Sequence, residues 1–166
     1  MVMIRPVTAE DSSALRAVRL EALRESSAAF GSTYAAEARL AESEWLARAT
    51  PDELGRSITF LAYDGEAPCG IVRGSQDDRA EATAFVQSMW VAPEQRRMGV
   101  GRELIEVVAE WALPRGVRTL KLMVTSSNQP AIRFYERLGF TMMGRAQPYP
   151  NDPDLVEYEM GRELNG

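Results

Sequence analysis

The segment 89–105 constrains the fold most narrowly, because it reads as a strand, a glycine-spaced basic loop and a helix in direct succession. A helix begins with backbone N–H groups that lack partners and with the positive end of its dipole, so an anion is favoured there. Gly99 and Gly101 carry no Cβ and let the backbone approach an anion closely. Three arginines, Arg96, Arg97 and Arg102, add planar donors that suit phosphate. The loop is therefore predicted to bind a diphosphate.

The spacing of the two glycines narrows the kind of diphosphate site. A dinucleotide-binding turn requires G-x-G-x-x-G after a strand, and a P-loop requires G-x-x-x-x-G-K-[ST]. Neither pattern occurs in the chain. The loop by itself also fits a tight strand-to-helix turn whose arginines are merely solvated.

Length and composition predict one globular domain spanning residues 1–166, because domains usually run to about 100–200 residues. The apolar and charged fractions, 45% and 26%, are ordinary for such a domain. No run of residues approaches the ~18 consecutive apolar residues of a membrane span, and no membrane partner is expected. The start of the chain lacks the pattern of a secretory leader, and Cys69 is the single cysteine, so a cytoplasmic location is expected.

The chain contains no histidine, and this absence excludes Ser-His-Asp and Cys-His catalysis, His-ligated zinc and an imidazole base. A proton acceptor must therefore be Asp, Glu, Tyr, a neutral amine or water. The formal net charge of −5 argues against a nucleic-acid partner, since phosphate neutralisation requires a basic face. The same charge is compatible with a cationic amine substrate.

The periodicity of apolar residues predicts hairpins in the first half of the chain and β-α-β units in the second. Such an order indicates an α/β fold with a mixed sheet flanked by helices. The expected strands are 2–7, 58–63, 69–74, 82–91, 119–124, 140–143 and 155–160. The expected helices run from Thr8 to about Ser26, over about 37–49 with Trp45 and Leu46 on the apolar face, from the glycine loop to Pro114, and from Asn128 to Gly139.

Two motifs together resemble the hallmarks of the GNAT superfamily of N-acetyltransferases. Arg96-x-x-Gly99-x-Gly101 is similar to the R/Q-x-x-G-x-G/A signature of that family. The segment Asn128–Phe140 resembles its N-x-x-A-x-x-F-Y-E-x-x-G-F motif, one helix and one strand further on. The resemblance implies a central, mostly antiparallel sheet whose parallel strands splay at a CoA cleft. It also implies acetyl-CoA as the co-substrate, with no metal.

The resemblance also assigns donor-binding residues by position. The strand end would hold the pantetheine arm and the acetyl carbonyl, and the loop would surround the pyrophosphate. These residues are Met89, Trp90, Val91, Arg96, Arg97, Met98, Gly99, Val100, Gly101 and Arg102. Asn128 would contact the arm further down, and Tyr135 would contact the cofactor and protonate the departing thiolate. A phenol of pKa ~10 keeps its proton at neutral pH, although helical spacing alone places Tyr135 in an apolar stripe.

The implied activity is transfer of an acetyl group to a primary amine of a small molecule or peptide, by direct attack in a ternary complex. The general base stays open among Glu81, Glu157, Glu159 and Tyr149. Met123 stands where relatives that acetylate protein N-termini often carry Glu, which argues against such substrates. A non-catalytic acyl-CoA-binding module is the alternative function, and a longer acyl chain and a homodimer also stay open.

The acceptor side is predicted to lie in the first two helices and in a loop over residues 146–153. Aromatic and acidic residues there could receive a cationic amine, unless they are simply exposed loop residues. These candidates are Phe30, Tyr34, Tyr149 and Asp152.

Overall fold

The computed structural model of the chain describes residues 1–26, 32–150 and 152–165. The strands are β1 (Val2–Pro6), β2 (Ser57–Asp64), β3 (Ala67–Gln76), β4 (Thr83–Val91), β5 (Thr119–Thr125), β6 (Thr141–Tyr149) and β7 (Asp152–Glu163). The helices are α1 (Ser12–Glu25), α2 (Tyr34–Ala38), α3 (Glu42–Ala49), α4 (Val100–Ala112) and α5 (Gln129–Arg137). Short 3-10 turns precede α1, precede the glycine loop and follow α4: η1 (Ala9–Asp11), η3 (Pro93–Gln95) and η4 (Leu113–Arg115).

The described strands form one seven-stranded sheet in the order β1-β2-β3-β4-β5-β7-β6. Neighbouring strands are antiparallel except β4 and β5, which are parallel. Because the chain connects these two strands through α4, the crossover lies where a parallel pair requires one. The expected mixed, mostly antiparallel sheet flanked by helices is confirmed.

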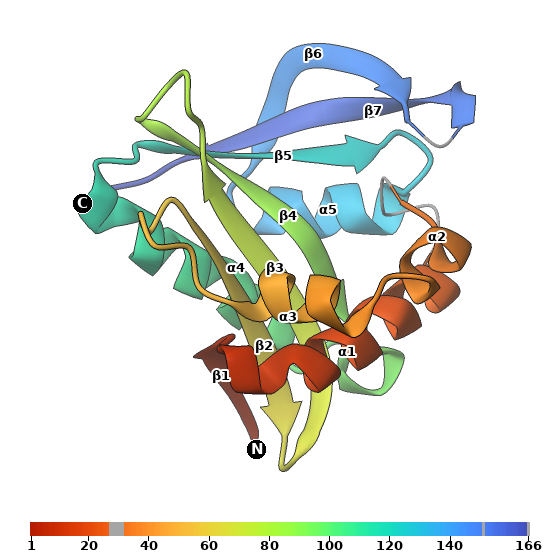
Figure 1. Cartoon of the computed structure of the whole chain (residues 1–166). Coiled ribbons are helices and arrows are strands. Elements are labelled where there is room, and N and C mark those ends of the chain that lie inside the picture. The colour runs from red at the N-terminus through yellow and green to blue at the C-terminus, as the bar shows by residue number, and fades with distance from the viewer. Residues whose placement is uncertain (27–31, 151, 166) are drawn as a thin grey trace.

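The strands β4 and β5 pair only at their first residues, from Thr83 with Thr119 to Phe85 with Lys121. Beyond this point they diverge (Figure 1). A β-bulge explains the divergence: the register of β4 against β3 shifts between Ile71 and Arg73, and Ser88 has a φ of 57°. Bulges of this kind bend the strand that carries the extra residue and increase its twist. The splayed strands expected from the family resemblance are therefore present.

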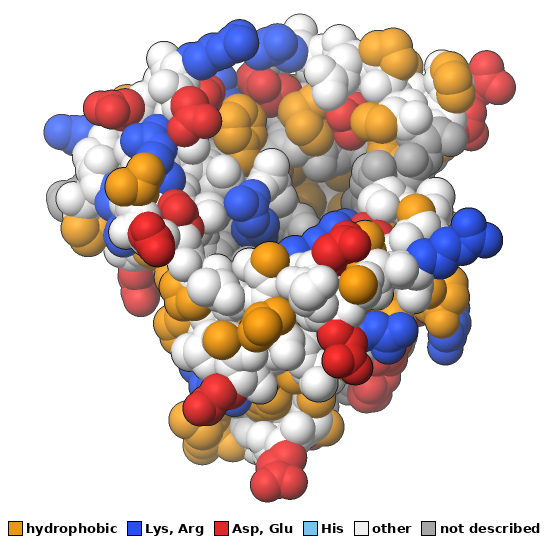
Figure 2. Space-filling view, in the orientation of Figure 1, with side chains coloured by type: hydrophobic (Ala, Val, Ile, Leu, Met, Phe, Trp, Pro, Cys, Tyr) orange, Lys and Arg blue, Asp and Glu red, His pale blue; other side chains and the backbone are white. Residues whose placement is uncertain are grey.

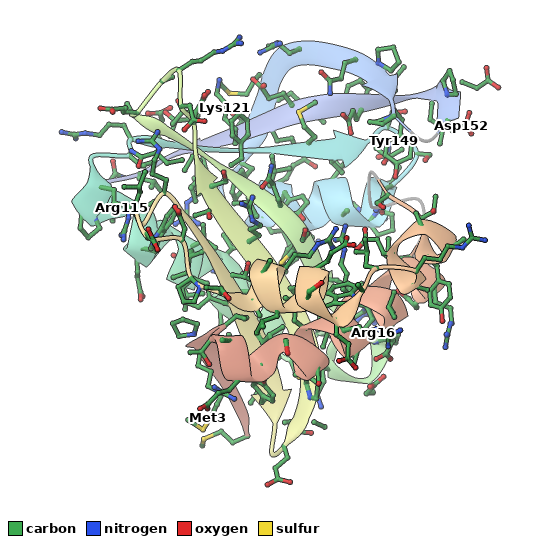
Figure 3. All side chains as sticks on the ribbon, in the orientation of Figure 1. Met3, Arg16, Arg115, Lys121, Tyr149 and Asp152 are labelled. Atoms are coloured by element: carbon green, nitrogen blue, oxygen red, sulfur yellow. The ribbon has the colours of Figure 1, made fainter. Side chains whose placement is uncertain are left out.

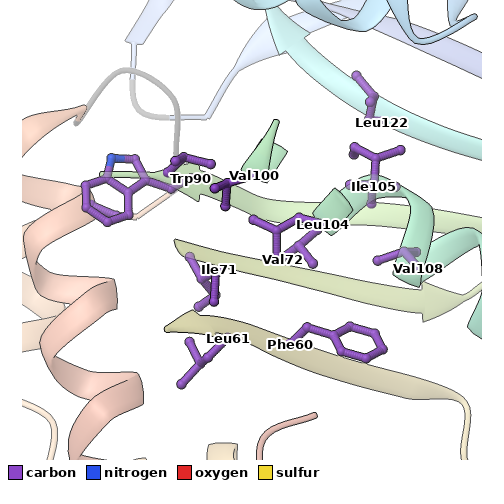
Figure 4. Close-up of a cluster of buried hydrophobic side chains, with 14 of the residues drawn as sticks. Phe60, Leu61, Ile71, Val72, Trp90, Val100, Leu104, Ile105, Val108 and Leu122 are labelled. Carbon is purple, nitrogen blue, oxygen red and sulfur yellow. The ribbon is translucent and has the colours of Figure 1, made fainter. Parts of the chain in front are cut away.

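Helices cover both faces of the sheet (Figure 1). One face carries α4 and α5, and the first helices cover β1 to β3 on the other face. The core lies mainly between α4 and β2 to β5, where Leu104, Ile105 and Val108 pack beside Val72 and Leu122 (Figure 4). Burial of these side chains drives the helix onto the sheet. It thereby fixes the start of α4 beside the open end of β4.

The turn before α1 forms as its sequence predicts. The backbone N–H of Thr8 donates to the carboxylate of Asp11 at 2.9 Å, and the N–H of Asp11 donates to the carbonyl of Thr8. Such reciprocal bonds satisfy N–H groups that a helix start would otherwise leave unpaired. The helix then runs to Glu25, close to the predicted end.

Two expectations about local structure are wrong. The helix expected over 37–49 is two helices, α2 and α3, and Leu46 is 47% exposed although Trp45 is buried. Adjacent residues on a helix point about 100° apart, so a short helix that buries Trp45 turns Leu46 outward. The loop expected over 146–153 is largely the tip of a hairpin, because β6 continues to Tyr149 and β7 begins at Asp152.

Across the described part of the chain, we find no helix with the length and apolar character that crossing a membrane requires.

Candidate active site

The glycine loop bends through two left-handed backbone conformations before α4 begins. Arg97 has a φ of 66° and Gly99 a φ of 86°. Gly99 is the N-cap residue, and the first bond inside the helix runs from the N–H of Glu103 to its carbonyl, at 3.1 Å. The backbone N–H groups of the first turn therefore have no intrahelical acceptor. Together with the helix dipole they form an end that favours an anion, and residues 96–99 are exposed around it.

The second glycine of the loop serves packing between the two motifs. A Cβ on Gly101 would lie 2.9 Å from Cζ of Phe134 and 3.3 Å from Cε of Met89. The start of α4 is thus pressed against α5 and against the end of β4. Sequence reasoning connected this glycine only with phosphate, because the contact with Phe134 belongs to the tertiary fold. The glycine loop and the helix of Tyr135 are therefore in direct contact.

The first arginine of the motif is turned toward α1. Nε of Arg96 donates to the carbonyl of Val91 at 2.9 Å, and its Nη2 donates to Glu25 at 2.9 Å. The indole N–H of Trp90 donates to the same carboxylate oxygen of Glu25 at 2.9 Å. Hydrogen bonds from Arg96, opposed by partial burial, lower the pKa of Glu25 to about 2. The hydrogen bonds of Arg96 and Trp90 to Glu25 therefore attach the loop to the end of α1, a contact that the sequence did not reveal.

A cavity of about 450 Å³ occupies the gap where β4 and β5 diverge. Residues from both faces of the sheet border it, so it passes between the strands. Of the predicted site residues, it brings together Met89, Asn128 and Tyr135. Glu157 and Tyr149 border it from β7 and β6.

The other predicted donor-binding residues lie outside this lining. The indole of Trp90 and the side chain of Val91 are buried, which leaves their backbone as the part that can contact a ligand. The side chains of Arg97, Met98 and Arg102 are exposed at the start of α4. The predicted donor-binding residues are thus divided between the loop at the start of α4 and the cavity beyond it.

Tyr135 lies in an apolar setting at the edge of this cavity. Its ring makes edge contacts with Phe134 at 5.2 Å and with Phe140 at 5.8 Å between centroids. Among the described residues, its hydroxyl has no hydrogen-bond partner. Burial raises the pKa of Tyr135 above its usual value. The phenol is therefore neutral at physiological pH and keeps a proton to donate.

The acidic candidates for a base are placed very differently. Glu157 is half-buried at the cavity, opposite Thr125 in the pairing of β5 with β7, and accepts a hydrogen bond from Gln147 at 2.6 Å. Glu159 is buried between Lys121 at 3.5 Å and Arg145 at 3.7 Å. Glu81 is exposed before β4 and does not border the cavity.

Asn128 fixes the start of α5 beside the cavity. Its side-chain oxygen accepts a hydrogen bond from the N–H of Ala131 at 3.3 Å, which makes it the N-cap of the helix. Asn128 also borders the cavity. The first residue of the second motif is thus both a structural cap and a cavity residue.

A second cavity, of about 630 Å³, adjoins the first on the side of α1 and α3. The two share Arg19, Arg73 and Ser88 as lining residues. Figure 2 shows this face hollowed between the helices and the β6–β7 hairpin, with basic side chains in the hollow. Arg115 and Tyr149, which border different cavities, lie on opposite sides of the view in Figure 3. The combined hollow therefore runs across the front of the sheet.

A buried carboxylate orders the arginines on the helical side of this hollow. Glu37 is 3% exposed and accepts two hydrogen bonds from Arg19, each of 3.0 Å, and one of 2.9 Å from Arg48. Burial alone would raise the pKa of Glu37, but these partners lower it to about 2. Arg19 also donates to the hydroxyl of Ser88, at the bulge of β4. The first helices are thereby tied to the bend that opens the gap.

The predicted acceptor residues are only partly brought together. Tyr149 is buried and borders the cavity at the gap, whereas Asp152 is exposed at the start of β7. The ring of Tyr34 is covered by the guanidinium of Arg24 at 4.6 Å. Phe30 lies outside the described residues.

Comparison with known proteins gives a family and a common fold. A model of the Acetyltransferase (GNAT) family matches residues 20–140. Streptothricin acetyltransferase of Streptomyces lavendulae is 35% identical over 91 residues, which cover 49% of this chain and 48% of that protein. The chain thus spans about half the length of this curated relative.

Solved structures share the architecture over nearly the whole chain. The acetyltransferase of GNAT family from Streptococcus pneumoniae has a TM-score of 0.81 and 25% identity, covering 99% of this chain and 100% of that chain. A putative acetyltransferase from Salmonella typhimurium, solved with its cofactor acetyl-CoA, has a TM-score of 0.80 and 20% identity, covering 100% of this chain and 95% of that chain. The family match extends across the glycine loop, the splayed strands and the helix of Tyr135. By these matches the chain belongs to the GNAT family of acetyltransferases.

Proposed function

We propose that the chain is an N-acetyltransferase that transfers the acetyl group of acetyl-CoA to a primary amine of a small molecule or peptide. One observation carries the proposal: the gap between β4 and β5 brings Tyr135 and Glu157 to one cavity, beside a helix start suited to a pyrophosphate. Membership of an acetyltransferase family supports it. Residues 1–166 act as a single domain in this proposal, since the described strands share one sheet.

The donor is held mainly by backbone groups. The N–H groups of the first turn of α4 receive the pyrophosphate, and the exposed guanidinium groups of Arg97 and Arg102 add charge. The residues from Met89 to Val91, which lose their partner strand where β5 diverges, offer backbone groups to the pantetheine arm and the acetyl carbonyl. Asn128 supplies a side-chain amide to the arm from the start of α5. The thioester is thereby placed in the gap.

Acyl transfer requires a neutral amine and a protonated leaving group. The amine nitrogen attacks the thioester carbon directly, the carbon–sulfur bond breaks, and the sulfur takes a proton from the hydroxyl of Tyr135. Burial raises the pKa of that phenol, so it remains a proton donor. The same apolar surroundings raise the basicity of the departing thiolate and favour transfer of the proton. A proton from bulk water then restores the phenol.

Glu157 is the residue best placed to remove the proton of the amine, through a water molecule. Its carboxylate is half-buried at the cavity and has an amide, not a cation, as its described partner. Glu159 is held by two cations, and Glu81 lies away from the cavity. Of the carboxylates open after sequence analysis, only Glu157 both borders the gap and lacks an ion pair among the described residues.

The test is release of free CoA from acetyl-CoA with a panel of amines. Tyr135→Phe should lower kcat by about 10²-fold or more, the usual range for general acid catalysis, with little change in acetyl-CoA affinity. Tyr158→Phe, at a tyrosine that is in neither cavity lining, is the matched control and should retain turnover. Equal turnover by Tyr135→Phe would exclude Tyr135 as the acid. Tight acetyl-CoA binding with no turnover of any amine would instead establish a non-catalytic acyl-CoA-binding module.

A further inference from the structure

Arg73 lies where the two cavities meet. It is on β3, it is half-buried, and it borders both hollows. Its Nη1 donates to the side-chain oxygen of Gln87 on β4 at 2.6 Å. Within the described residues, no carboxylate oxygen lies within 4.0 Å of its guanidinium group. Arg73 is therefore a cation of the cavity wall held by a neutral partner.

The other arginines of the hollow differ from Arg73 in their partners. Arg19 and Arg48 share the carboxylate of Glu37. Arg115 donates to the carbonyls of Gly55 at 2.7 Å and Trp111 at 2.8 Å, and its guanidinium covers the ring of Trp111. The guanidinium groups of Arg19, Arg48 and Arg115 are therefore engaged in contacts within the protein.

The wall of the larger cavity is positively charged as a whole. Its described lining contains four arginines and one carboxylate, Asp52. The cations outnumber the carboxylates even when Glu37, which pairs with Arg19 and Arg48, is counted. The carboxylate of Asp52 accepts the backbone N–H of Arg56 at 2.7 Å. In a chain of formal net charge −5, this hollow concentrates positive charge. A cleft with one sign of charge attracts ligands of the opposite sign.

Physical chemistry favours an anion beside Arg73. A guanidinium cannot give up its proton in a protein, so it cannot escape desolvation by becoming neutral. Desolvation works against its charged form, and only the more distant Asp52 opposes that effect on the pKa of Arg73. A planar oxyanion would compensate the charge with paired hydrogen bonds. Carboxylates are the commonest oxyanions of small amines.

We infer that the acceptor is a small primary amine that also carries a carboxylate or a similar oxyanion, which Arg73 binds while the amine faces Glu157 and Tyr135. The inference rests on the proposed function and names its substrate class. Arg73, Glu157 and Tyr135 border the same cavity, which has a volume of about 450 Å³. Cavities of about 300–1,000 Å³ are typical of such ligands. The larger hollow beyond Arg73 has room for the rest of the acceptor.

The first experiment leaves the protein unchanged and varies the acceptor. Free L-amino acids are compared with the corresponding amino acid amides, which keep the shape and the amine but lose the anion. The acid should exceed its amide in kcat/KM by about 10- to 100-fold, the range for a hydrogen bond to a charged partner. Because kcat/KM also depends on the pKa of the amine, the comparison is made at several pH values and corrected to the neutral amine.

The second experiment changes the arginine. Arg73→Gln should reduce the ratio of acid to amide to near one, mainly by raising KM for the acid, and Arg73→Lys should keep part of the preference. Arg16→Gln, on the exposed face of α1 (Figure 3), is the matched control and should leave the ratio unchanged. Thermal melting of each variant separates a loss of selectivity from a loss of folding.

The outcomes distinguish this inference from the function on which it rests. Acetylation of acids and amides with equal efficiency by the unchanged protein would overturn the inference alone. A preference for acids that persists undiminished in Arg73→Gln would also overturn it, because another residue would then hold the anion. Acetylation of no amine at all would overturn the proposed function and the substrate class together.

Discussion

The proposed donor side of the gap is formed mostly by backbone groups of one contiguous segment, from the end of β4 to the first turn of α4. The proposed acceptor side is lined by side chains from several separate elements, among them α1, α3, β3, β6 and β7. Backbone N–H groups at a helix start are the same whatever the side chains are, so this part of the site can stay constant while its neighbours change. Side chains that converge from separate elements can each be replaced alone. Under the proposed function, this difference would allow one donor site to serve acceptors of unlike chemistry.

The two sides also hold their charges differently. On the donor side, Arg97 and Arg102 are exposed, and Arg96 is bound to Glu25. On the acceptor side, Glu37 neutralises part of a dense arginine cluster, and Arg73 is left with a neutral partner. The exposed arginines of the proposed donor side are thus solvated. On the proposed acceptor side, the guanidinium of Arg73 has a neutral partner, so an anionic ligand can pair with its charge.

The largest effect is expected on the acceptor side, from Glu37→Gln. Removing this buried carboxylate breaks its ion pairs with Arg19, whose side chain is 14% exposed, and with Arg48, and should destabilise the fold by about 3 kcal/mol. Acetyl-CoA affinity should change less than the kcat/KM for the amine. Denaturant unfolding, calorimetric titration with acetyl-CoA and steady-state kinetics measure the three quantities.

Glu44→Gln is the matched control for that prediction, because this carboxylate is exposed on α3. It should alter stability by less than about 0.5 kcal/mol. Equal stability of the two variants would show that Glu37 does not order the acceptor side.

Glu25→Gln tests the hydrogen bonds by which Arg96 and Trp90 attach the glycine loop to α1. It removes the charge that holds Arg96 and Trp90 and should cost about 1–2 kcal/mol of stability. Because the folded-state pKa of Glu25 is about 2 against an ordinary 4.5, its contribution is complete above pH 4.5 and is lost as pH falls toward about 2. Unfolding followed from pH 7 to pH 3 should therefore show a smaller acid loss in Glu25→Gln than in the unchanged protein. An equal loss of stability with falling pH in both proteins would show that the Glu25 contacts do not stabilise the fold.

Gly101→Ala tests the junction of the two motifs on the donor side. The new Cβ meets Phe134 at 2.9 Å and should destabilise the fold by about 1 kcal/mol while weakening acetyl-CoA binding. Phe134→Leu in the same chain shortens the opposing side chain and should restore part of both losses. Calorimetric titration and thermal melting follow the two quantities. A double variant no better than Gly101→Ala would show that the glycine is required for phosphate approach alone.

The smallest effects are expected from the exposed arginines of the donor loop. Arg97→Gln and Arg102→Gln should each weaken acetyl-CoA binding by about 0.5 kcal/mol, because exposed charge pairs contribute little. The loss should shrink as salt rises, since salt screens such charges. Arg118→Gln, exposed before β5, controls for net charge. A loss unaffected by salt would indicate that the side chains are buried by the cofactor.

Much of the fold was predictable because its elements are marked locally. The strand, loop and helix around Gly99, the hairpin of β2 and β3, and the capped helix at Asn128 all formed close to their expected bounds. The predictions of local structure were wrong where packing against the rest of the fold determines the structure. Trp45 and Leu46 are adjacent, large hydrophobic residues, and the packing of α3 determines which of them is buried. Residues 146–153 look like a loop, but pairing with β7 extends β6 to Tyr149.

The sequence by itself determined the donor motif, since a glycine at positive φ, a helix start and a phenol at a fixed helical position are properties of short segments. Tertiary structure alone decided the partners. Arg96 donates a hydrogen bond to Glu25, 71 residues away in the sequence, and Arg19 donates one to Ser88, 69 residues away. Arg73 borders both cavities. Such contacts depend on strand register and on helix placement, which the whole core sets together. For this reason the sequence indicated what donates the acetyl group, and only the fold gave grounds for naming a class of acceptor.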